Sequence, residues 1–385
     1  MIIPWELNVT VRAVGAAGTA FALMLVVMPP LIRWLRRMKV GETGAKGQGA
    51  TEVDAMREAK KGTPTMGGLG LVGCIALAAL VWCDPANYRT WLLLFGLLSF
   101  ALVGFLDDRE KLYKGAKGTP LWLKLVIQIG AATACGIGLY LINQRLDELL
   151  LVNHPAGMPW DHYKKSLGGD SYIVRLGLNQ LQFPFLPVEH AVNLGMWIVV
   201  WTMFVTTACA NGVNFTDGMD GLAGGTVFIA ALAFMIIAYL TCRVDAADYL
   251  QVYYVSGGQD VAVFSAAIAG ACLGFLWFNA APAEVFMGDT GSQALGGVLG
   301  LIALNTKQEF LILLVGAVFV AEAGSVALQI ISFRCFGGRR IFKCAPLHHH
   351  FQKLTPPWPE SKIVMRFWIV AALCALAALA TLKIR

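Results

Sequence analysis

The sequence is poor in charge. Only 14% of its 385 residues are Asp, Glu, Lys or Arg, whereas 57% are hydrophobic. A soluble domain carries about 25% charged residues, so this chain has a second solvent for much of its surface. The lipid bilayer is the expected second solvent, because long apolar segments recur from one end of the sequence to the other. We therefore predict a single polytopic membrane domain over residues 1–385, and not several soluble domains.

Signatures of several other protein classes are also missing. Nine Cys residues occur without a CxxC pair, and most lie in apolar runs, where Cys acts as a small buried hydrophobe. This pattern excludes a disulfide framework and zinc-finger spacing. No Walker motif or HExxH is present, which disfavours a P-loop enzyme and a membrane metalloprotease. The net charge of +6 is typical of basic cytoplasmic loops, so we expect no nucleic-acid partner.

Ten apolar segments are candidate membrane helices. A helix needs about 20 mostly apolar residues to cross a bilayer. Helices are the default spanning element because they satisfy their own backbone hydrogen bonds, so we predict an all-α integral membrane fold. The first segment lacks a basic stretch before it and a small-residue cleavage site after it, so we interpret it as a retained helix. The predicted spans are 11–32, 67–83, 91–106, 121–142, 192–208, 221–241, 260–278, 292–304, 309–331 and 364–383.

Lysine and arginine predict the orientation of these spans. Segment 33–63 contains eight Lys or Arg residues against four acids, which indicates the cytoplasmic side. Ten spans then place both termini in the periplasm. The long segment 143–190 falls on the periplasmic side, and its stretches 172–176 and 181–185 are predicted to pair as a small hairpin. The remaining cytoplasmic segments are 107–120, 209–220, 279–291 and 332–363, of which the last contains three consecutive histidines.

Five polar clusters fall on the predicted cytoplasmic side. Loop residues without a common role would be scattered over both sides of the membrane, so their placement on one face indicates a shared site. The clusters are 60–68, 107–108, 211–221, 279–292 and 346–351.

Asp107 and Asp108 follow the third predicted span directly. Successive helical residues point about 100° apart, so the two carboxylates cannot share one direction. One of them can face a metal or a proton while the other orients a neighbour. Acids at an apolar boundary are costly unless they are paired, and they oppose the dipole at a helix C-terminus. These costs favour a functional role over that of a solvated helix end.

Carboxylates in the third and fourth cytoplasmic segments suit a hard cation. Mg²⁺ takes oxygen ligands and usually keeps waters and substrate phosphates, and Asp217 and Asp220 lie close to the amides of Asn211 and Asn214. Both acids precede glycine in turn dipeptides, and Asp220 could instead cap the next helix. Asp289 could be an N-cap, or it could hold a metal beside a phosphate at a helix N-terminus.

Three consecutive histidines, His348, His349 and His350, invite a zinc interpretation. Adjacent histidines rarely face one ion, and no Cys or HExxH accompanies them. A phosphate-binding or proton-donating role is more economical, because histidine titrates near neutral pH. Lys60 and Thr65 are suited to meet anions, although Lys60 could equally belong to the positive-inside signal.

In order and spacing, five motifs resemble those of the bacterial phospho-N-acetylmuramoyl-pentapeptide transferase family. The double Asp and the Asp-containing loops are similar to the wider superfamily of polyprenyl-phosphate sugar-1-phosphate transferases, whereas the triple His points to this branch. The resemblance covers about residues 60–351. The motifs are Lys-Lys-Gly-Thr-Pro-Thr-Met-Gly-Gly, Gly-Phe-Leu-Asp-Asp, Asn-Gly-Val-Asn-Phe-Thr-Asp-Gly-Met-Asp-Gly-Leu-Ala, Val-Phe-Met-Gly-Asp-Thr-Gly-Ser and Ala-Pro-Leu-His-His-His-Phe.

The resemblance implies a reaction and a set of site residues. UDP-N-acetylmuramoyl-pentapeptide and undecaprenyl phosphate would give lipid I and UMP, with Mg²⁺, in a homodimer of the bacterial inner membrane whose active site faces the cytoplasm. It implies Asp107, Asp108 and Asp289 as essential acids, with Asp289 the favoured Mg²⁺ ligand. It places Lys124 near the active-site floor and Phe286 against uracil. Other residues that it places near the nucleotide, phosphates or sugar are Lys60, Thr65, Asn214, Asp217, Asp220, Asn279, His348 and His349.

Two mechanisms and two other functions stay open at this point. An aspartate, most favourably Asp107, removes a proton from the acceptor phosphate or orients it; alternatively, an aspartate forms a covalent phosphosugar. A related transferase acting on an N-acetylhexosamine-1-phosphate is the nearest alternative function. A transporter is the alternative from another class, but transporters place coupling residues near the bilayer midplane, whereas these clusters lie at one face.

Overall fold

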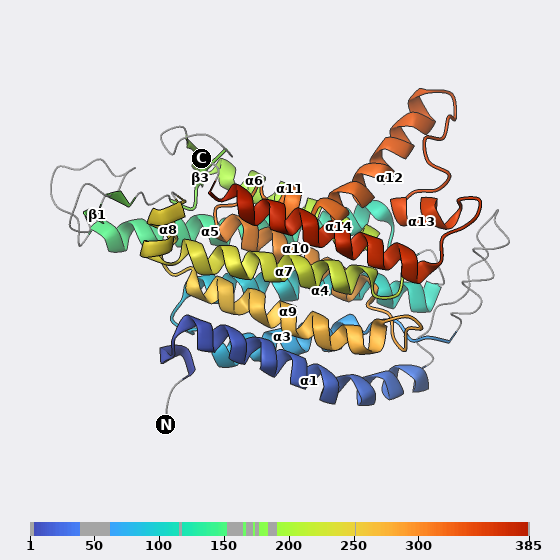
Figure 1. Ribbon diagram of the computed structural model, residues 1–385, viewed down its shortest axis with the longest axis horizontal. Helices are drawn as coiled ribbons and strands as arrows, with labels where there is room; N and C mark the ends of the chain where they lie inside the picture. The colour runs from blue at the N-terminus through green and yellow to red at the C-terminus, as the bar shows by residue number, and fades with distance from the viewer. Residues whose placement is uncertain are drawn as a thin grey trace.

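The computed structural model describes residues 4–38, 62–114, 118–151, 165–166, 172–173, 177–183, 191–250 and 252–383, and its regular structure is almost entirely helical (Figure 1). After a short 3-10 helix, Pro4–Glu6, the helices are α1 (Val9–Arg37), α3 (Gly68–Trp82), α4 (Tyr88–Lys114), α5 (Leu121–Leu151), α6 (Trp197–Thr216), α7 (Leu222–Thr241), α8 (Val244–Leu250), α9 (Gln259–Asn279), α10 (Gly288–Asn305), α11 (Ile312–Val315), α12 (Ala317–Cys335), α13 (Leu347–Gln352) and α14 (Glu360–Thr381).

The helices confirm the predicted all-α membrane fold. Within the described residues, eight helices are long and apolar enough to cross a membrane: α1, α4, α5, α6, α7, α9, α12 and α14. Two further predicted spans correspond to α3, which is apolar but has only 15 residues, and to α10, which has 18. The predicted span 309–331 is divided at Gly316 into α11 and α12. The side of the membrane that each end faces remains a prediction.

Helices α9 and α10 form the centre of the bundle. Residues Thr290–Asn305 of α10 are all buried, and α9 is 83% buried over its apolar window, against 28% for α1, α5 and α12. Helices α1 and α7 pack on α9, while α4 and α6 pack on α10 (Figure 1). Burial on every side explains why α9 and α10 carry so many Gly and Ala residues, because small residues let helix backbones approach closely.

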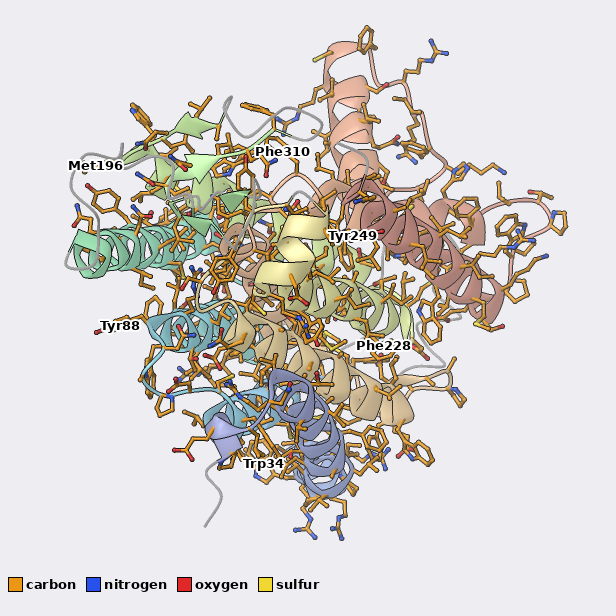
Figure 2. All side chains as sticks on the ribbon, turned by 60° about the vertical axis from the view of Figure 1, so that its left-hand side comes forward. Trp34, Tyr88, Met196, Phe228, Tyr249 and Phe310 are labelled. Carbon is orange, nitrogen blue, oxygen red and sulfur yellow. The ribbon has the colours of Figure 1, made fainter. Side chains whose placement is uncertain are left out.

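The outer helices expose large apolar and aromatic side chains. Trp34, Tyr88 and Met196 are among the exposed residues at the periphery (Figure 2). Trp34 lies near the end of α1. Tyr88, the first residue of α4, and Tyr249 of α8 lie at the other end of the bundle. Aromatic residues near both ends of a bundle are typical of the two membrane–water interfaces.

Two short antiparallel ladders lie at the end of the bundle where α1 begins and α14 ends. Strand β1 (Lys165–Ser166) pairs with β2 (Tyr172–Ile173), and β3 (Gln180–Leu181) pairs with β4 (Val192–Asn193). A small hairpin thus lies within 143–190, but the predicted pairing of 172–176 with 181–185 is wrong, because β2 pairs with β1 and β3 pairs with β4.

The reason lies in how β3 is anchored. The backbone N–H of Leu178 donates to Asn143 of α5, and that of Leu194 donates to the carbonyl of Asn179. These bonds hold β3 beside α5 and the entry to α6, so it takes its partner from the segment before α6. Helix α5 itself continues to Leu151, past the predicted end at residue 142.

Candidate active site

The described members of the five predicted clusters meet at the other end of the bundle, where α4, α6 and α9 end and α10 begins. Lys60 falls in residues 39–61, outside the described part of the chain. The loop before α3 and the loop before α10 are joined by backbone hydrogen bonds. The N–H of Phe286 donates to Pro64 O at 2.9 Å, and the N–H groups of Gly67 and Gly68 donate back to the carbonyls of Phe286 and Met287, each at 2.9 Å.

These bonds set Thr65 and Asp108 on either side of Gly288. Gly288 has a φ of +73°, and a Cβ there would lie 2.8 Å from Asp108 Oδ2 and 3.0 Å from Thr65 Oγ1. Only glycine satisfies both the left-handed backbone and this lack of space. A second close approach brings α4 against α10, because a Cβ on Gly104 would overlap the backbone carbonyl of Asp289.

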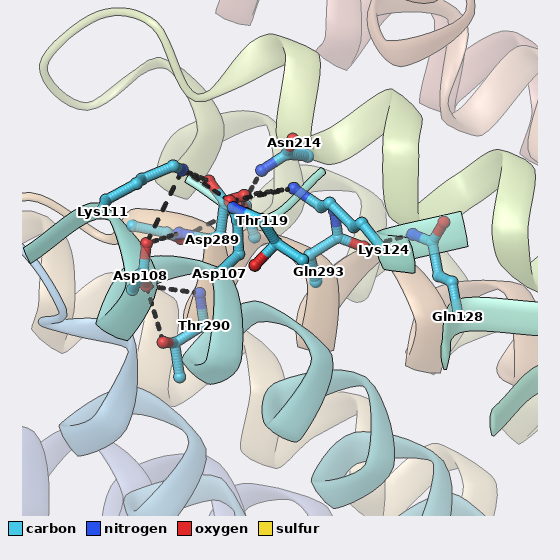
Figure 3. A network of polar contacts seen from close by, with 12 residues as sticks. Asp107, Asp108, Lys111, Thr119, Lys124, Gln128, Asn214, Asp289, Thr290 and Gln293 are labelled. Carbon is cyan, nitrogen blue, oxygen red and sulfur yellow. Dashed lines mark hydrogen bonds and ion pairs between the residues drawn. The ribbon is translucent and has the colours of Figure 1, made fainter. Parts of the chain in front are cut away.

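The sequence predicted that Asp107 and Asp108 lie at the end of a helix. Helix α4 instead continues through Lys114, so both residues lie inside it. Asp108 points at the start of α10 and accepts hydrogen bonds from Asp289 N at 3.1 Å, Thr290 N at 2.9 Å and Thr290 Oγ1 at 2.7 Å (Figure 3). The first N–H groups of a helix have no partner within it, so Asp108 satisfies them from another helix. This carboxylate therefore fixes the position of Asp289.

Asp108→Ala should release the start of α10. We expect a loss of about 1–2 kcal/mol in stability, the scale of a lost helix cap, together with a large loss of activity because Asp289 is no longer held. Thermal unfolding in detergent and a turnover assay measure the two effects. Normal turnover by a folded Asp108→Ala protein would contradict this role.

Asp107 and Asp289 face each other across two lysines (Figure 3). Lys124 forms ion pairs with both carboxylates, at 3.3 Å to Asp107 Oδ2 and closer to Asp289 Oδ2. Lys111 Nζ lies 2.8 Å from Asp107 Oδ2 and 3.0 Å from Asp289 Oδ1. Thr119 N also donates to Asp107, at 2.9 Å. The Lys111 side chain is 40% exposed, whereas those of Asp107 and Asp289 are 5% and 14% exposed, so Lys111 forms the accessible side of this ion cluster.

Asp217 lies in the negative potential beside the ion cluster. It is the C-cap residue of α6, because α6 continues to Thr216 and includes Asn211 and Asn214, which the sequence placed in a loop. Burial, together with the negative charges of Asp289 and Asp108, raises the pKa of the Asp217 carboxyl to about 8. A carboxyl whose pKa is raised by neighbouring carboxylates marks a place that favours a cation.

The donor set fits Mg²⁺ that is shared with a substrate. The Lys111 ammonium group contacts both Asp107 and Asp289. Oxygens of the two carboxylates are therefore close enough to bind the same cation. Among the residues that the structure describes, no group of three His, Cys, Asp or Glu side chains could hold a metal by itself. Mg²⁺ commonly binds one or two carboxylates and completes its shell with water and substrate phosphates, so two acids are sufficient.

The remaining polar residues of α6 and the next loop hold neighbouring segments. Asn214 Nδ2 donates to Ser292 Oγ of α10 at 2.9 Å. Asp220 is not the cap of α7, because Gly221, with a φ of +78°, occupies the N-cap position and Asp220 Oδ2 accepts from Ala283 N at 3.1 Å. Asn279 accepts from Gly221 N at 3.0 Å and donates to Val285 O at 2.9 Å. Asp220 and Asn279 thus bring the loops before α7 and α10 together, with Phe286 half-buried on the second loop.

The three histidines of α13 point to different partners. His348 is buried, and its Nδ1 lies 3.1 Å from Glu322 Oε2 without hydrogen-bond geometry. His349 Nδ1 lies 2.7 Å from Gln352 Oε1. His350 Nδ1 accepts from the backbone N–H of Lys343 at 3.1 Å. His348 reaches the loop after α6, where its Nε2 packs on Gly218 so closely that a Cβ at that position would overlap it.

Gly218→Ala should therefore displace His348 from the site. We expect turnover to fall by about tenfold or more, because a displacement of about 1 Å can cost 10²-fold. The matched control is Gly324→Ala in α12, where an added Cβ meets nothing within 4 Å. Equal turnover by the two variants would contradict a role for the His348 position.

Four residues of this region were not predicted as site residues: Lys111, Gln128, Glu322 and Gln293. The sequence indicates Lys111 only as one of the basic residues of segment 107–120, after the third predicted span. The other three lie in apolar helices, where a polar or acidic residue is itself a functional signal. Glu322, whose side chain is 0% exposed, accepts a hydrogen bond from the backbone N–H of His348 at 3.2 Å.

Comparisons with known proteins identify the family of the chain. The family model described as glycosyl transferase family 4 matches residues 90–307. The chain is 42% identical over 382 residues to the phospho-N-acetylmuramoyl-pentapeptide-transferase of Solidesulfovibrio magneticus and 40% identical over 378 residues to that of Desulfotalea psychrophila. Each alignment covers 98% of this chain and 94% of the relative. The chain is therefore a multi-pass bacterial membrane protein that belongs to the phospho-N-acetylmuramoyl-pentapeptide transferase family.

Proposed function

We propose that this chain transfers phospho-N-acetylmuramoyl-pentapeptide from UDP-N-acetylmuramoyl-pentapeptide to undecaprenyl phosphate, giving lipid I and UMP. The observation that supports it best is the ion cluster of Asp107, Asp289, Lys111 and Lys124 at one end of an apolar bundle. A soluble donor and a lipid-bound acceptor can meet only at a membrane surface. Relatives that match nearly the full length of the chain are named for this transfer.

The chemistry requires two anions to approach each other. The donor carries a pyrophosphate and the acceptor a phosphate, so their attack is opposed by charge repulsion. Lys111 and Lys124 supply positive charge at the carboxylate pair, and the exposed Lys111 is the first to meet an incoming phosphate. Asp289 would hold Mg²⁺, which would supply positive charge against the pyrophosphate and the leaving UMP. Positioning and electrostatics of this kind account for most of the catalysis in phosphoryl transfer.

Asp107 is the residue proposed to act on the acceptor. A phosphate monoester has a second pKa of about 6, so it is already a nucleophile and needs orientation or removal of one remaining proton. Asp108 is less suited to this role, because its carboxylate holds backbone N–H groups at the start of α10, whereas one oxygen of Asp107 is held only by lysine side chains that can turn to a phosphate. We therefore favour direct attack by the acceptor phosphate over a covalent phosphosugar on an aspartate.

Rapid-quench analysis without acceptor lipid tests the direct-attack mechanism. Incubation of the purified protein with labelled donor and Mg²⁺ should leave the protein unlabelled and release no UMP. A trapped phosphosugar on Asp107 or Asp108 would establish the covalent mechanism instead.

The remaining predicted residues are proposed to bind the donor. Asn214, Asp217, Asp220 and Asn279 surround the nucleotide, and Phe286 stacks on uracil. Lys60, Thr65, His348 and His349 lie near the phosphates or the sugar. We further propose that this end of the bundle faces the cytoplasm of a bacterial inner membrane and that the protein is a homodimer there.

A comparison of two donors tests the proposed function. Purified protein in detergent, with Mg²⁺ and undecaprenyl phosphate, should release UMP from UDP-N-acetylmuramoyl-pentapeptide but not from UDP-N-acetylglucosamine. Release from the second donor would support the related hexosamine-phosphate transferase. Release from neither donor, with a folded protein, would reject the transferase proposal and favour a transporter.

A further inference from the structure

A pair of buried glutamines repeats the contact between α5 and α10 one helical turn below the ion cluster. Gln128 follows Lys124 by four residues on α5, and Gln293 follows Asp289 by four residues on α10. Both helices begin at the site, so residues four positions along lie below it on the same faces. Gln128 Nε2 donates to Gln293 Oε1 (Figure 3). Asn211 Nδ2 of α6 donates to Gln128 Oε1 at 3.0 Å.

Burying these two glutamine side chains costs free energy. Both residues are 0% exposed. The Nε2 group of Gln293 has no hydrogen-bond partner, although it is buried. Leaving a buried donor unsatisfied costs about 1–3 kcal/mol, and leucines at both positions would avoid that cost. A polar pair that persists at such a cost calls for an explanation other than packing.

The pair constrains what α5 can do relative to α10. Apolar contacts between membrane helices permit rotation and sliding, whereas an interhelical hydrogen bond fixes both directions. Lys124 is carried by the first turn of α5 and must reach Asp107 and Asp289 together. Lys124 keeps those contacts only if α5 neither rotates about its axis nor slides along α10.

We propose that Gln128 and Gln293 are positioning residues that hold Lys124 against the carboxylate pair, with Asn211 fixing the orientation of the Gln128 amide. They do not contact the reacting groups and act through Lys124. The inference rests on the proposed transferase function, since turnover is its main measure.

The first test replaces each glutamine with leucine in the full-length protein in detergent. We expect Gln128→Leu and Gln293→Leu to lower kcat by about 10–100-fold with little change in donor KM, because a misplacement near 1 Å costs about 10²-fold. The matched control is Asn305→Leu. Asn305 is a buried amide at the other end of α10, and its Oδ1 accepts from Arg89 Nη1 at 2.9 Å. This control should lower the unfolding temperature and leave kcat unchanged.

The double variant separates positioning from stability. In Gln128→Leu/Gln293→Leu no amide of the pair is left without a partner, so the unfolding temperature should return toward that of the wild type. We expect kcat to stay low, because apolar side chains do not fix the register of α5. Recovery of kcat together with the unfolding temperature would overturn the proposal, as would wild-type kcat in both single variants.

A second background tests whether the pair acts through Lys124. In Lys124→Gln, assayed with radiolabelled donor, adding Gln293→Leu should change turnover by less than about twofold, because coupled residues are not additive. A full additional 10–100-fold loss would show that the glutamines act independently of Lys124. An inactive wild-type protein would instead reject the proposed function and not this inference.

Discussion

Asp289→Asn is expected to lower kcat by about 10³-fold, the scale on which a preorganised electrostatic contact contributes to catalysis. The substitution keeps the shape of the side chain and removes one negative charge from the centre of the ion cluster. Lys111 and Lys124 both contact this carboxylate, so its loss leaves their charges facing Asp107 and, for Lys111, Asp108 at 3.9 Å. It also removes the proposed Mg²⁺ ligand. The measurement is UMP release by purified protein over a range of Mg²⁺ concentrations.

The control for this variant is Asp245→Asn. Asp245 is paired with Arg243 at 2.6 Å, its side chain is 68% exposed, and it lies at the end of the bundle away from the site. Its substitution should leave turnover unchanged. Activity of Asp289→Asn at the wild-type Mg²⁺ requirement would show that Asp289 is not the metal ligand.

Asp260→Ala is expected to cause the largest loss of stability, about 3–5 kcal/mol, because it leaves a buried guanidinium without its counter-ion. Asp260 of α9 forms an ion pair with Arg12 of α1, and their side chains are 0% and 4% exposed. The same carboxylate accepts from Asp84 N at 3.0 Å and from the amide of Asn87. One acid therefore joins α1, α9 and the turn between α3 and α4. The unfolding temperature in detergent measures the loss.

Two further variants make this prediction specific. Asp245→Ala breaks an exposed ion pair and should leave the unfolding temperature within error of the wild type. Arg12→Met/Asp260→Leu removes both buried charges and should recover most of the stability lost by Asp260→Ala. The ion pair has no structural role if Asp260→Ala unfolds at the same temperature as Asp245→Ala.

The sequence predicts the helices of this fold well and their ends poorly. Apolar runs located ten helices because bilayer thickness sets the length of such a run. Polar residues do not end a helix, however. Helix α4 continues eight residues past its predicted end at 106, with Lys111 and Asp107 paired one turn apart, and α6 continues to Thr216. Hydropathy reports where lipid ends, whereas helix ends depend on local hydrogen bonds.

The same limit explains which site residues were found. Asp107 and Asp108 stand out because charge beside an apolar run is costly, whereas Asp289 was chosen through the family resemblance. The partner roles of Lys111, Gln128 and Gln293 depend on the register between helices far apart in the chain. Lys124 and Asp289, for example, are separated by 165 residues. A single sequence contains no record of that register, so the cap from Asp108 to α10 and the glutamine pair emerge only from the structure.

We propose that the phosphosugar passes from the soluble donor to the lipid phosphate in one reaction at the ion cluster. The most direct test is the stoichiometry of products from protein reconstituted with undecaprenyl phosphate and UDP-N-acetylmuramoyl-pentapeptide labelled in the sugar. We predict equal amounts of UMP and labelled lipid, and neither product when the acceptor lipid is omitted. UMP formation without labelled lipid, or at an undiminished rate without acceptor, would contradict the account.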